Sequence, residues 1–149
     1  MNKKKSYDGY WYLAIPYSKY PKGIEESFKL ASKIAAEFLR LGHCVYSPIS
    51  HTHSIAVYGG FDCYDHEIWL PFDEQLMKMA KGIIVIQAEG WDESKGVLHE
   101  LEYFFKAGKV IHNIHEKTDE FISSINEISD LIITMELSER LEAHKEIII

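Results

Sequence analysis

Ser94, Gly96 and Glu100, in the pattern S-x-G-x-x-x-E, could place a carboxylate beside a bound ligand. The pattern spans the first turns of a predicted helix, where free N–H groups and a positive dipole end suit an anionic group. Successive helical residues are about 100° apart, so Glu100 shares the face of Gly96 and Glu102 does not. Glycine inside a helix costs about 1 kcal/mol relative to alanine, which predicts a packing or close-approach role for Gly96.

Each of these residues also has a purely structural interpretation. A glutamate on a helix is most often a solvated charge, and Ser94 is a good N-cap whether or not it contacts a ligand. The spacing alone therefore leaves both interpretations of Glu100 open.

Alternating strands and helices are predicted to position this motif. The run 82–88 (GIIVIQA) is continuously apolar, as a central parallel strand buried on both faces requires. The loop 89–93 then leads into the helix that carries the motif. The other predicted elements are strands at 10–16, 43–47 and 109–114, a helix from residue 24 that Gly42 ends, helices at 65–80 and 95–107 with Pro71 starting the regular part of the first, and loops at 17–22 and 49–65.

The order of these elements predicts one α/β domain over 1–149, with a core at about 10–114 and a C-terminal extension at 115–149. Strands joined through helices by short loops favour a Rossmann- or flavodoxin-like parallel sheet flanked by helices. In such sheets ligands bind outside the carboxyl ends of the strands, so the informative loops are 17–22, 47–53 and 88–94.

Composition limits the classes of function. The chain of 149 residues is 46% hydrophobic and carries a net charge of −7. An acidic chain without a Lys/Arg cluster argues against a polynucleotide partner, although a small nucleotide remains allowed. No segment approaches the ~18 apolar residues of a membrane span, so we expect a cytoplasmic protein without a membrane partner. Cys44 and Cys63 have neither disulfide-framework nor zinc-ligand spacing.

Three segments in a fixed order resemble a known family. They are YLAIPYS near the start, D-E-Q-L-x-x-x-A-K-G-I-I-V-I in the middle, and S-x-G-x-x-x-E-L-x-Y followed by G-K-V. Over roughly residues 10 to 112 they are similar to the nucleoside 2-deoxyribosyltransferase-like superfamily, which includes deoxynucleoside 5′-monophosphate N-glycosidases. An uncharacterised branch with G-W-x-x-S-x-G and S-P-I-S-H looks closest.

The resemblance implies three catalytic residues and no metal or cofactor. Glu100 corresponds to the family's nucleophile, which attacks the anomeric carbon and forms a covalent glycosyl-enzyme. Asp73 corresponds to a carboxylate in sugar binding and proton delivery to the base, and Tyr12 to the first-strand tyrosine that holds the nucleophile. Because departure of a base generates oxocarbenium character, a carboxylate on one face and an acid near the leaving group suit the reaction.

The substrate implied is a nucleoside or its 5′-monophosphate. Ser94 stands where monophosphate hydrolases have a phosphate-contacting serine and transferases an aspartate, which favours a nucleotide. In the loops, Ser18 is expected to be a further hydrogen-bond donor and His51 to line the sugar or base pocket. Trp91 or Tyr17 is expected to stack on a base. The residues predicted to contact substrate are Ser94, Gly96, Ser18, Tyr17, His51 and Trp91.

Two departures from the family keep other functions open. Lys81 stands where the family has an acidic residue, and the AIPYS loop lacks the glycine and arginine of the known phosphate-binding loop. A non-catalytic nucleotide-binding module of the same fold is therefore an alternative. A metal-dependent hydrolase built on His51, His53 and His66 is another, although their spacing matches no closed ligand pattern.

We also expect a homo-oligomer, a dimer or larger, because the resembling enzymes complete their pockets across an interface. The acidic, Ile-rich end of the chain is a candidate interface element, with helical spacing at Phe121, Ile125 and Ile128. A monomer in size-exclusion chromatography with light scattering would contradict this expectation.

Overall fold

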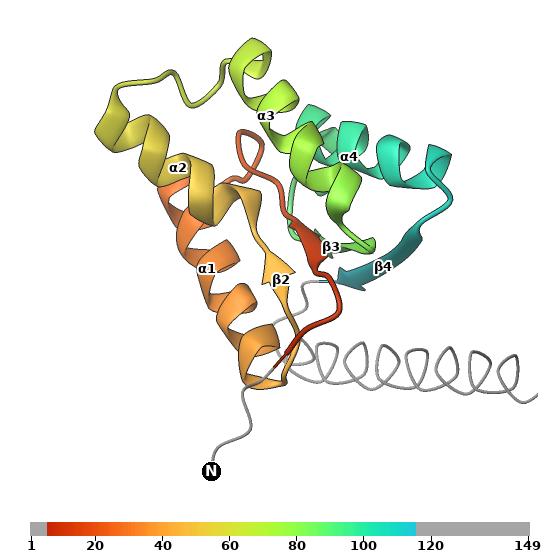
Figure 1. Ribbon diagram of the computed structural model, residues 1–149. Coiled ribbons are helices and arrows are strands. Elements are labelled where there is room, and N and C mark those ends of the chain that lie inside the picture. The colour runs from red at the N-terminus through yellow and green to blue at the C-terminus, as the bar shows by residue number, and fades with distance from the viewer. Residues whose placement is uncertain (1–5, 116–149) are drawn as a thin grey trace, which may run out of the picture.

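The computed structural model describes residues 6–115 and places a parallel sheet at the centre of an α/β fold (Figure 1). Four strands run in the order β2-β1-β3-β4, and every neighbouring pair is parallel. With four flanking α-helices, this is the Rossmann- or flavodoxin-like arrangement that the sequence predicted. The elements are β1 (Trp11–Ala14), α1 (Ile24–Arg40), β2 (Val45–Tyr46), α2 (Pro48–Gly59), α3 (His66–Met79), β3 (Gly82–Gln87), the 3-10 turn η1 (Trp91–Glu93), α4 (Lys95–Lys106) and β4 (Val110–His115).

Capping side chains explain where three helices begin. Ser47, Asp65 and Ser94 each accept a hydrogen bond from a backbone N–H in the first turn of α2, α3 and α4 respectively. Each bond satisfies a donor that a helix start leaves free, and the predicted N-cap role of Ser94 is confirmed. Gly42 follows the last turn of α1 with a φ of 93°, which glycine adopts without strain.

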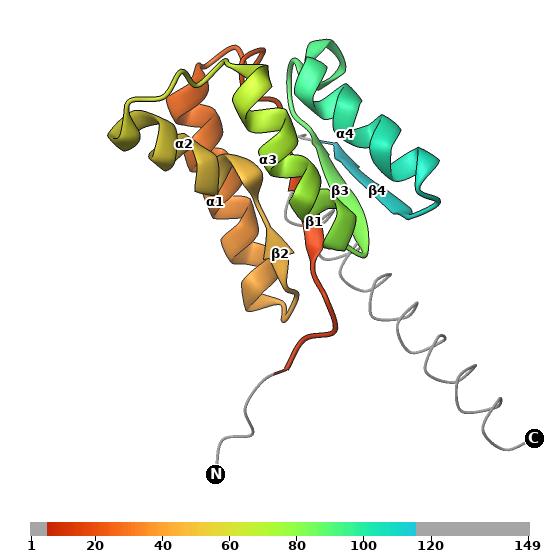
Figure 2. The ribbon, with the colours of Figure 1, turned by 45° about the horizontal axis from the view of Figure 1, so that its top comes forward.

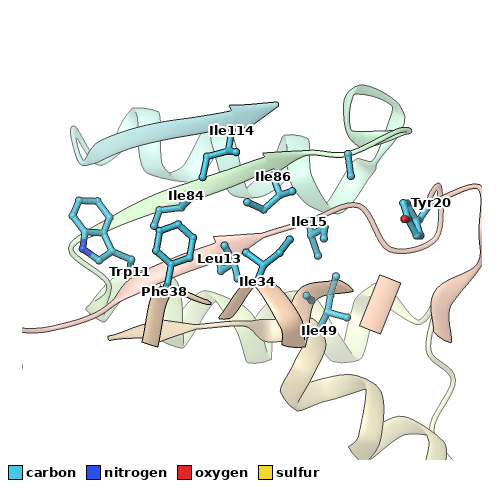
Figure 3. Close-up of a cluster of buried hydrophobic side chains, with 12 residues drawn as sticks. Trp11, Leu13, Ile15, Tyr20, Ile34, Phe38, Ile49, Ile84, Ile86 and Ile114 are labelled. Carbon is cyan, nitrogen blue, oxygen red and sulfur yellow. The ribbon is translucent and has the colours of Figure 1, made fainter. Parts of the chain in front are cut away.

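The sheet separates two clusters of apolar side chains. On one face Ile34 and Phe38 of α1 pack against Leu13 of β1 and Ile84 of β3 (Figure 3). On the other face α3 and α4 cover the strands, and Figures 1 and 2 show these two helices together, away from α1. The buried members of this second cluster are Tyr12, Ala14, Met77, Ala80, Ile83, Val85, Val97 and Phe104.

The segment 49–65 was predicted as a loop, but most of it is helical. This helix is α2, which has Pro48 in its first turn and left-handed Gly60 after its last. The prediction was wrong because the apolar residues of α2 are spread around the helix rather than gathered in a stripe, and because Pro48 starts the helix as well as ending the strand. Pro71 likewise lies inside α3, which is regular from His66.

The order of the strands creates a crevice where a ligand can bind. From β1 the chain passes through α1 to β2 on one side, and then through α2 and α3 to β3 on the other side of β1. At such a reversal the loops beyond the carboxyl ends of adjacent strands diverge. No helix within residues 6–115 is long and apolar enough to cross a membrane. The predicted interface element at the end of the chain lies outside the described residues.

Candidate active site

A pocket lies beyond the carboxyl ends of β1 and β2, beside the start of α4. It is therefore formed at the strand ends where the sheet topology predicted a ligand. Polar groups reach it from the loop after β1, from α2 and the loop that follows α2, from α3, and from the N-cap and second turn of α4. The predicted site residues that line it are Tyr17, Ser18, Asp73, Ser94, Gly96 and Glu100.

Glu100 lines this pocket, and Tyr12, which does not line it, is the buried partner of Glu100. The Tyr12 hydroxyl donates a hydrogen bond of 2.9 Å to Oε1 of Glu100. Tyr12 belongs to the central strand β1 and Glu100 to α4, so the packing of this helix on the sheet brings together residues 88 positions apart. This is the contact that the family resemblance implies for the two residues.

Asp73 brings a second carboxyl group to the pocket from α3. Its Oδ1 atom is buried and has no hydrogen-bond partner among the described residues. A buried acceptor without a partner is costly, on the order of 1–3 kcal/mol, and such groups are uncommon in folded proteins. A ligand that donates a hydrogen bond to Asp73 would remove this cost.

Burial raises the pKa of both carboxyl groups toward neutrality. The pKa of Glu100 is raised to about 8, chiefly by desolvation and further by the charge of Asp73, while the hydrogen bond from Tyr12 acts in the opposite direction. Desolvation raises the pKa of Asp73 to about 7. The two groups therefore titrate close together, and between about pH 7 and 8 the pair carries a single proton, mostly on Glu100. In such a pair the protonated carboxyl group can donate its proton to a leaving group, and the carboxylate can attack the carbon from which that group departs.

The start of α4 leaves room for a ligand at Gly96. A Cβ atom built on Gly96 would have a single neighbour within 4 Å among the described residues, Oγ of Ser94 at 3.9 Å. Packing therefore does not explain the glycine, and the space beside it belongs to the pocket. The Ser94 Oγ accepts a hydrogen bond from the Val97 N–H at 3.3 Å. Its own O–H hydrogen stays available to a ligand.

A close backbone contact positions the loop after β1. Gly90, in the loop after β3, has a φ of 90°, and a Cβ atom there would lie 2.2 Å from the carbonyl oxygen of Lys19. Only glycine permits both this conformation and this approach. The contact holds the loop that carries Tyr17 and Ser18 against the loop that leads to Ser94.

Comparison with known families identifies the chain's own family. A family model described as "Domain of unknown function (DUF1937)" matches residues 9–116, which include the whole sheet and all the pocket residues described above. The chain belongs to this family. A search of curated proteins finds no match.

Part of the pocket of this DUF1937 chain was not predicted to bind substrate, although His53 and His66 in it were predicted as metal ligands of the alternative hydrolase. The residues of this part come from α2, from the loop between α2 and α3, and from the first turns of α3. The sequence signal was the density of His, Tyr and Trp between 51 and 69. Because α2 was not predicted as a helix, the sequence could not indicate which of these side chains face the pocket. They are Pro48, Ile49, Thr52, His53, Ala56, Cys63, Tyr64, His66, Trp69 and Leu70.

The structure does not bring His51 and Trp91 to this pocket. His51 is exposed, with its ring centroid 6.0 Å from that of Tyr46 and 5.9 Å from that of Phe72. Because α2 is helical, Ile49, Thr52 and His53 lie on its pocket face and His51 is turned away. Trp91 instead lines a separate hollow with Tyr20.

The histidines predicted for the metal-dependent alternative form no metal-binding group among the described residues, although His53 and His66 line the same pocket. Both ring nitrogens of His53 are engaged, Nδ1 with Tyr17 and Nε2 with Glu25, and His51 stacks on Phe72. No group of three His, Cys, Asp or Glu side chains that could hold a metal ion occurs within residues 6–115. The metal-dependent hydrolase therefore finds no support in the DUF1937 region.

The departure at Lys81 lies away from the pocket. Lys81 immediately precedes β3, at the amino end of the strand, and its Nζ atom is 5.3 Å from the ring centroid of Trp11. Its substitution for an acidic residue therefore leaves the carboxyl pair untouched. Of the two departures, only the loop with Tyr17 and Ser18 reaches the site.

Proposed function

We propose that this protein cleaves or transfers the N-glycosidic bond of a nucleoside or its 5′-monophosphate, with Glu100 as nucleophile. The observation that carries the proposal is that Glu100, held by the buried Tyr12 hydroxyl, lines the same pocket as Asp73, whose Oδ1 has no partner among the described residues. The DUF1937 family is related to the nucleoside 2-deoxyribosyltransferase-like superfamily, and this relation supports the same assignment.

In the proposed reaction, the ionised Glu100 attacks the anomeric carbon while the bond from that carbon to the base nitrogen breaks. Its electron pair leaves with the base, and protonated Asp73 delivers its proton to the base. The glycosyl ester on Glu100 is then opened by water, or by a second base in a transfer reaction, with the Asp73 carboxylate accepting the proton. Tyr12 orients Glu100 and favours its ionised form.

The charge of the pocket bears on the choice between nucleoside and nucleotide. The described residues that line it include two carboxyl groups and no Lys or Arg. A phosphate would depend on Ser94 and on the N–H groups at the start of α4. Ser94 therefore favours a monophosphate as substrate, whereas the lack of a lining Lys or Arg favours a nucleoside. We propose that the nucleoside is turned over at least as well as its monophosphate.

The test is detection of free base by chromatography after incubation with nucleosides and their 5′-monophosphates. Wild type is expected to release base from at least one member of the panel. Glu100→Ala should lower this release by at least about 10³-fold while circular dichroism shows an intact fold. Glu102→Ala is the matched control, because Glu102 lies on the same helix but pairs with Lys106 at the surface.

The other outcome of the panel is equally informative. Thermal stabilisation by nucleosides or nucleotides without release of base would contradict the glycosidase proposal. It would select the non-catalytic binding module instead.

A further inference from the structure

A second set of hydrogen bonds reaches the pocket from α1 and α2. His53 of α2 is 5% exposed, and its ring stacks on Phe28 with centroids 4.6 Å apart. Its Nδ1 atom lies 2.5 Å from the Tyr17 hydroxyl oxygen, and its Nε2 atom lies 2.9 Å from Oε2 of Glu25. The imidazole therefore links a carboxylate on α1 to a hydroxyl group that lines the pocket.

With a neutral imidazole, this arrangement sets the direction of each hydrogen bond. An ionised carboxylate can only accept, so Nε2 of His53 carries the hydrogen that it donates to Glu25. In a neutral imidazole the other nitrogen is then an acceptor, and it receives the Tyr17 O–H. The Tyr17 oxygen is left with lone pairs alone for any group that enters the pocket.

Tyr17 is not suited to an acid–base step. Burial and the neighbouring Cys63 side chain raise the pKa of its hydroxyl well above the ordinary value for tyrosine. The phenol thus keeps its proton in the neutral range, and that proton is directed at His53. Recognition is the remaining use of an acceptor in this position.

We propose that Tyr17 is a specificity-determining acceptor that selects substrates carrying a hydrogen-bond donor, and that His53 and Glu25 are positioning residues that set its polarity. The inference rests on the proposed function for the kind of substrate. On a nucleoside the available donors are a sugar hydroxyl and the exocyclic amine of the base. A substrate without the matching donor leaves the Tyr17 lone pairs unsatisfied, which costs about 10- to 100-fold in affinity.

The test measures binding by calorimetry with three probes: 2′-deoxyadenosine, its 3′-deoxy analogue, and purine 2′-deoxyriboside, which lacks the amine. Glu100→Gln is used throughout to prevent turnover, with and without Tyr17→Phe. With Tyr17 present, one analogue should bind about 10- to 100-fold more weakly than 2′-deoxyadenosine. In Tyr17→Phe this difference should vanish, and the analogue concerned tells whether the sugar or the base supplies the donor.

Glu25→Gln tests the positioning role. Glutamine can donate as well as accept, so it no longer forces the hydrogen onto Nε2, and the donor preference should shrink while thermal stability stays unchanged. Glu26→Gln is the matched control, because Glu26 is the next residue of α1 and its carboxylate pairs with Lys29 at the surface. Equal donor preference in the two variants would overturn the roles of Glu25 and His53.

The binding measurement separates this inference from the proposed function. A donor preference that depends on Tyr17, found in a protein that releases no base, supports the inference and removes the glycosidase. Base release together with a preference that survives Tyr17→Phe overturns the inference alone. Failure of all three probes to bind also overturns it, and the nucleoside panel then decides the glycosidase separately.

Discussion

The ionisation of Glu100 depends on two neighbours with opposite effects. The hydrogen bond from Tyr12 lowers its pKa, and the charge of Asp73 raises it. The proposed reaction needs Glu100 ionised and Asp73 protonated at the same time. Because the pKa of Glu100, about 8, lies above that of Asp73, about 7, a single proton on the pair sits mostly on Glu100 between these values. The reactive form, with the proton on Asp73, is a minority species whose population is largest in the same interval. We expect a narrow, bell-shaped dependence of kcat/KM on pH with its maximum there.

Tyr12→Phe and Asp73→Asn should move that profile in opposite directions. Without the Tyr12 hydroxyl, the ionisation of Glu100 shifts to higher pH. Without the Asp73 charge it shifts to lower pH, and the alkaline limb disappears together with most of the rate because the base loses its proton donor. The measurement is kcat/KM for base release from pH 5 to 10. Shifts of the same sign in both variants would contradict the assignment.

The residues proposed for catalysis were easier to single out from the sequence than the residues proposed to select the substrate. Glu100, Asp73 and Tyr12 lie in short motifs that occur in the same order as in the resembling superfamily. The Tyr17–His53–Glu25 contacts join positions with no sequence pattern in common, and His53 is 28 residues from its carboxylate. Sequence could place neither His53 toward the pocket nor His51 away from it, because that choice depends on the helical phase of α2.

At the scale of elements, local signals decided which predictions succeeded. The apolar run of β3 and the N-cap of α4 are strong signals, and both elements were predicted within a residue or two of their bounds. The strand predicted at 43–47 is reduced to Val45–Tyr46 because only these residues pair with β1. The helix α2 carries no apolar stripe, so only tertiary contacts reveal it.

At the start of α4, one substitution is expected to stabilise the fold and to weaken substrate binding. Gly96→Ala should raise the midpoint of thermal unfolding by about 2–4 °C, since alanine favours the helix by about 1 kcal/mol and meets no close neighbour. The same methyl group enters the pocket, so KM should rise about tenfold or more. Lys95→Ala, on the exposed side of the same turn, should leave KM unchanged. An unaltered KM in Gly96→Ala would show that substrate does not approach this helix start.

For the whole molecule, the site has a cost in folding that depends on pH. Folding transfers Glu100 and Asp73 from water, where their pKa values are 4.5 and 3.8, to a buried pocket that raises both. The folded state therefore binds more protons than the unfolded state between these limits. The stability contributed by the protonated groups is complete below about pH 4 and is lost as pH rises through about 7 and 8.

Glu100→Gln should remove about half of this dependence, because the pKa values of Glu100 and Asp73 are raised by similar amounts and glutamine has the same shape and no charge to desolvate. The difference in thermal midpoint between Glu100→Gln and wild type should grow with pH from about 4.5 to about 8 and then level off. One pKa unit corresponds to about 1.4 kcal/mol, so the difference should change by at least about 3 °C. Differential scanning calorimetry across this range measures it, with Glu102→Gln as the exposed control that shows no such rise. A constant difference would mean that Glu100 is not buried as a neutral acid, and the protein would then keep this proposed nucleophile ionised without losing stability.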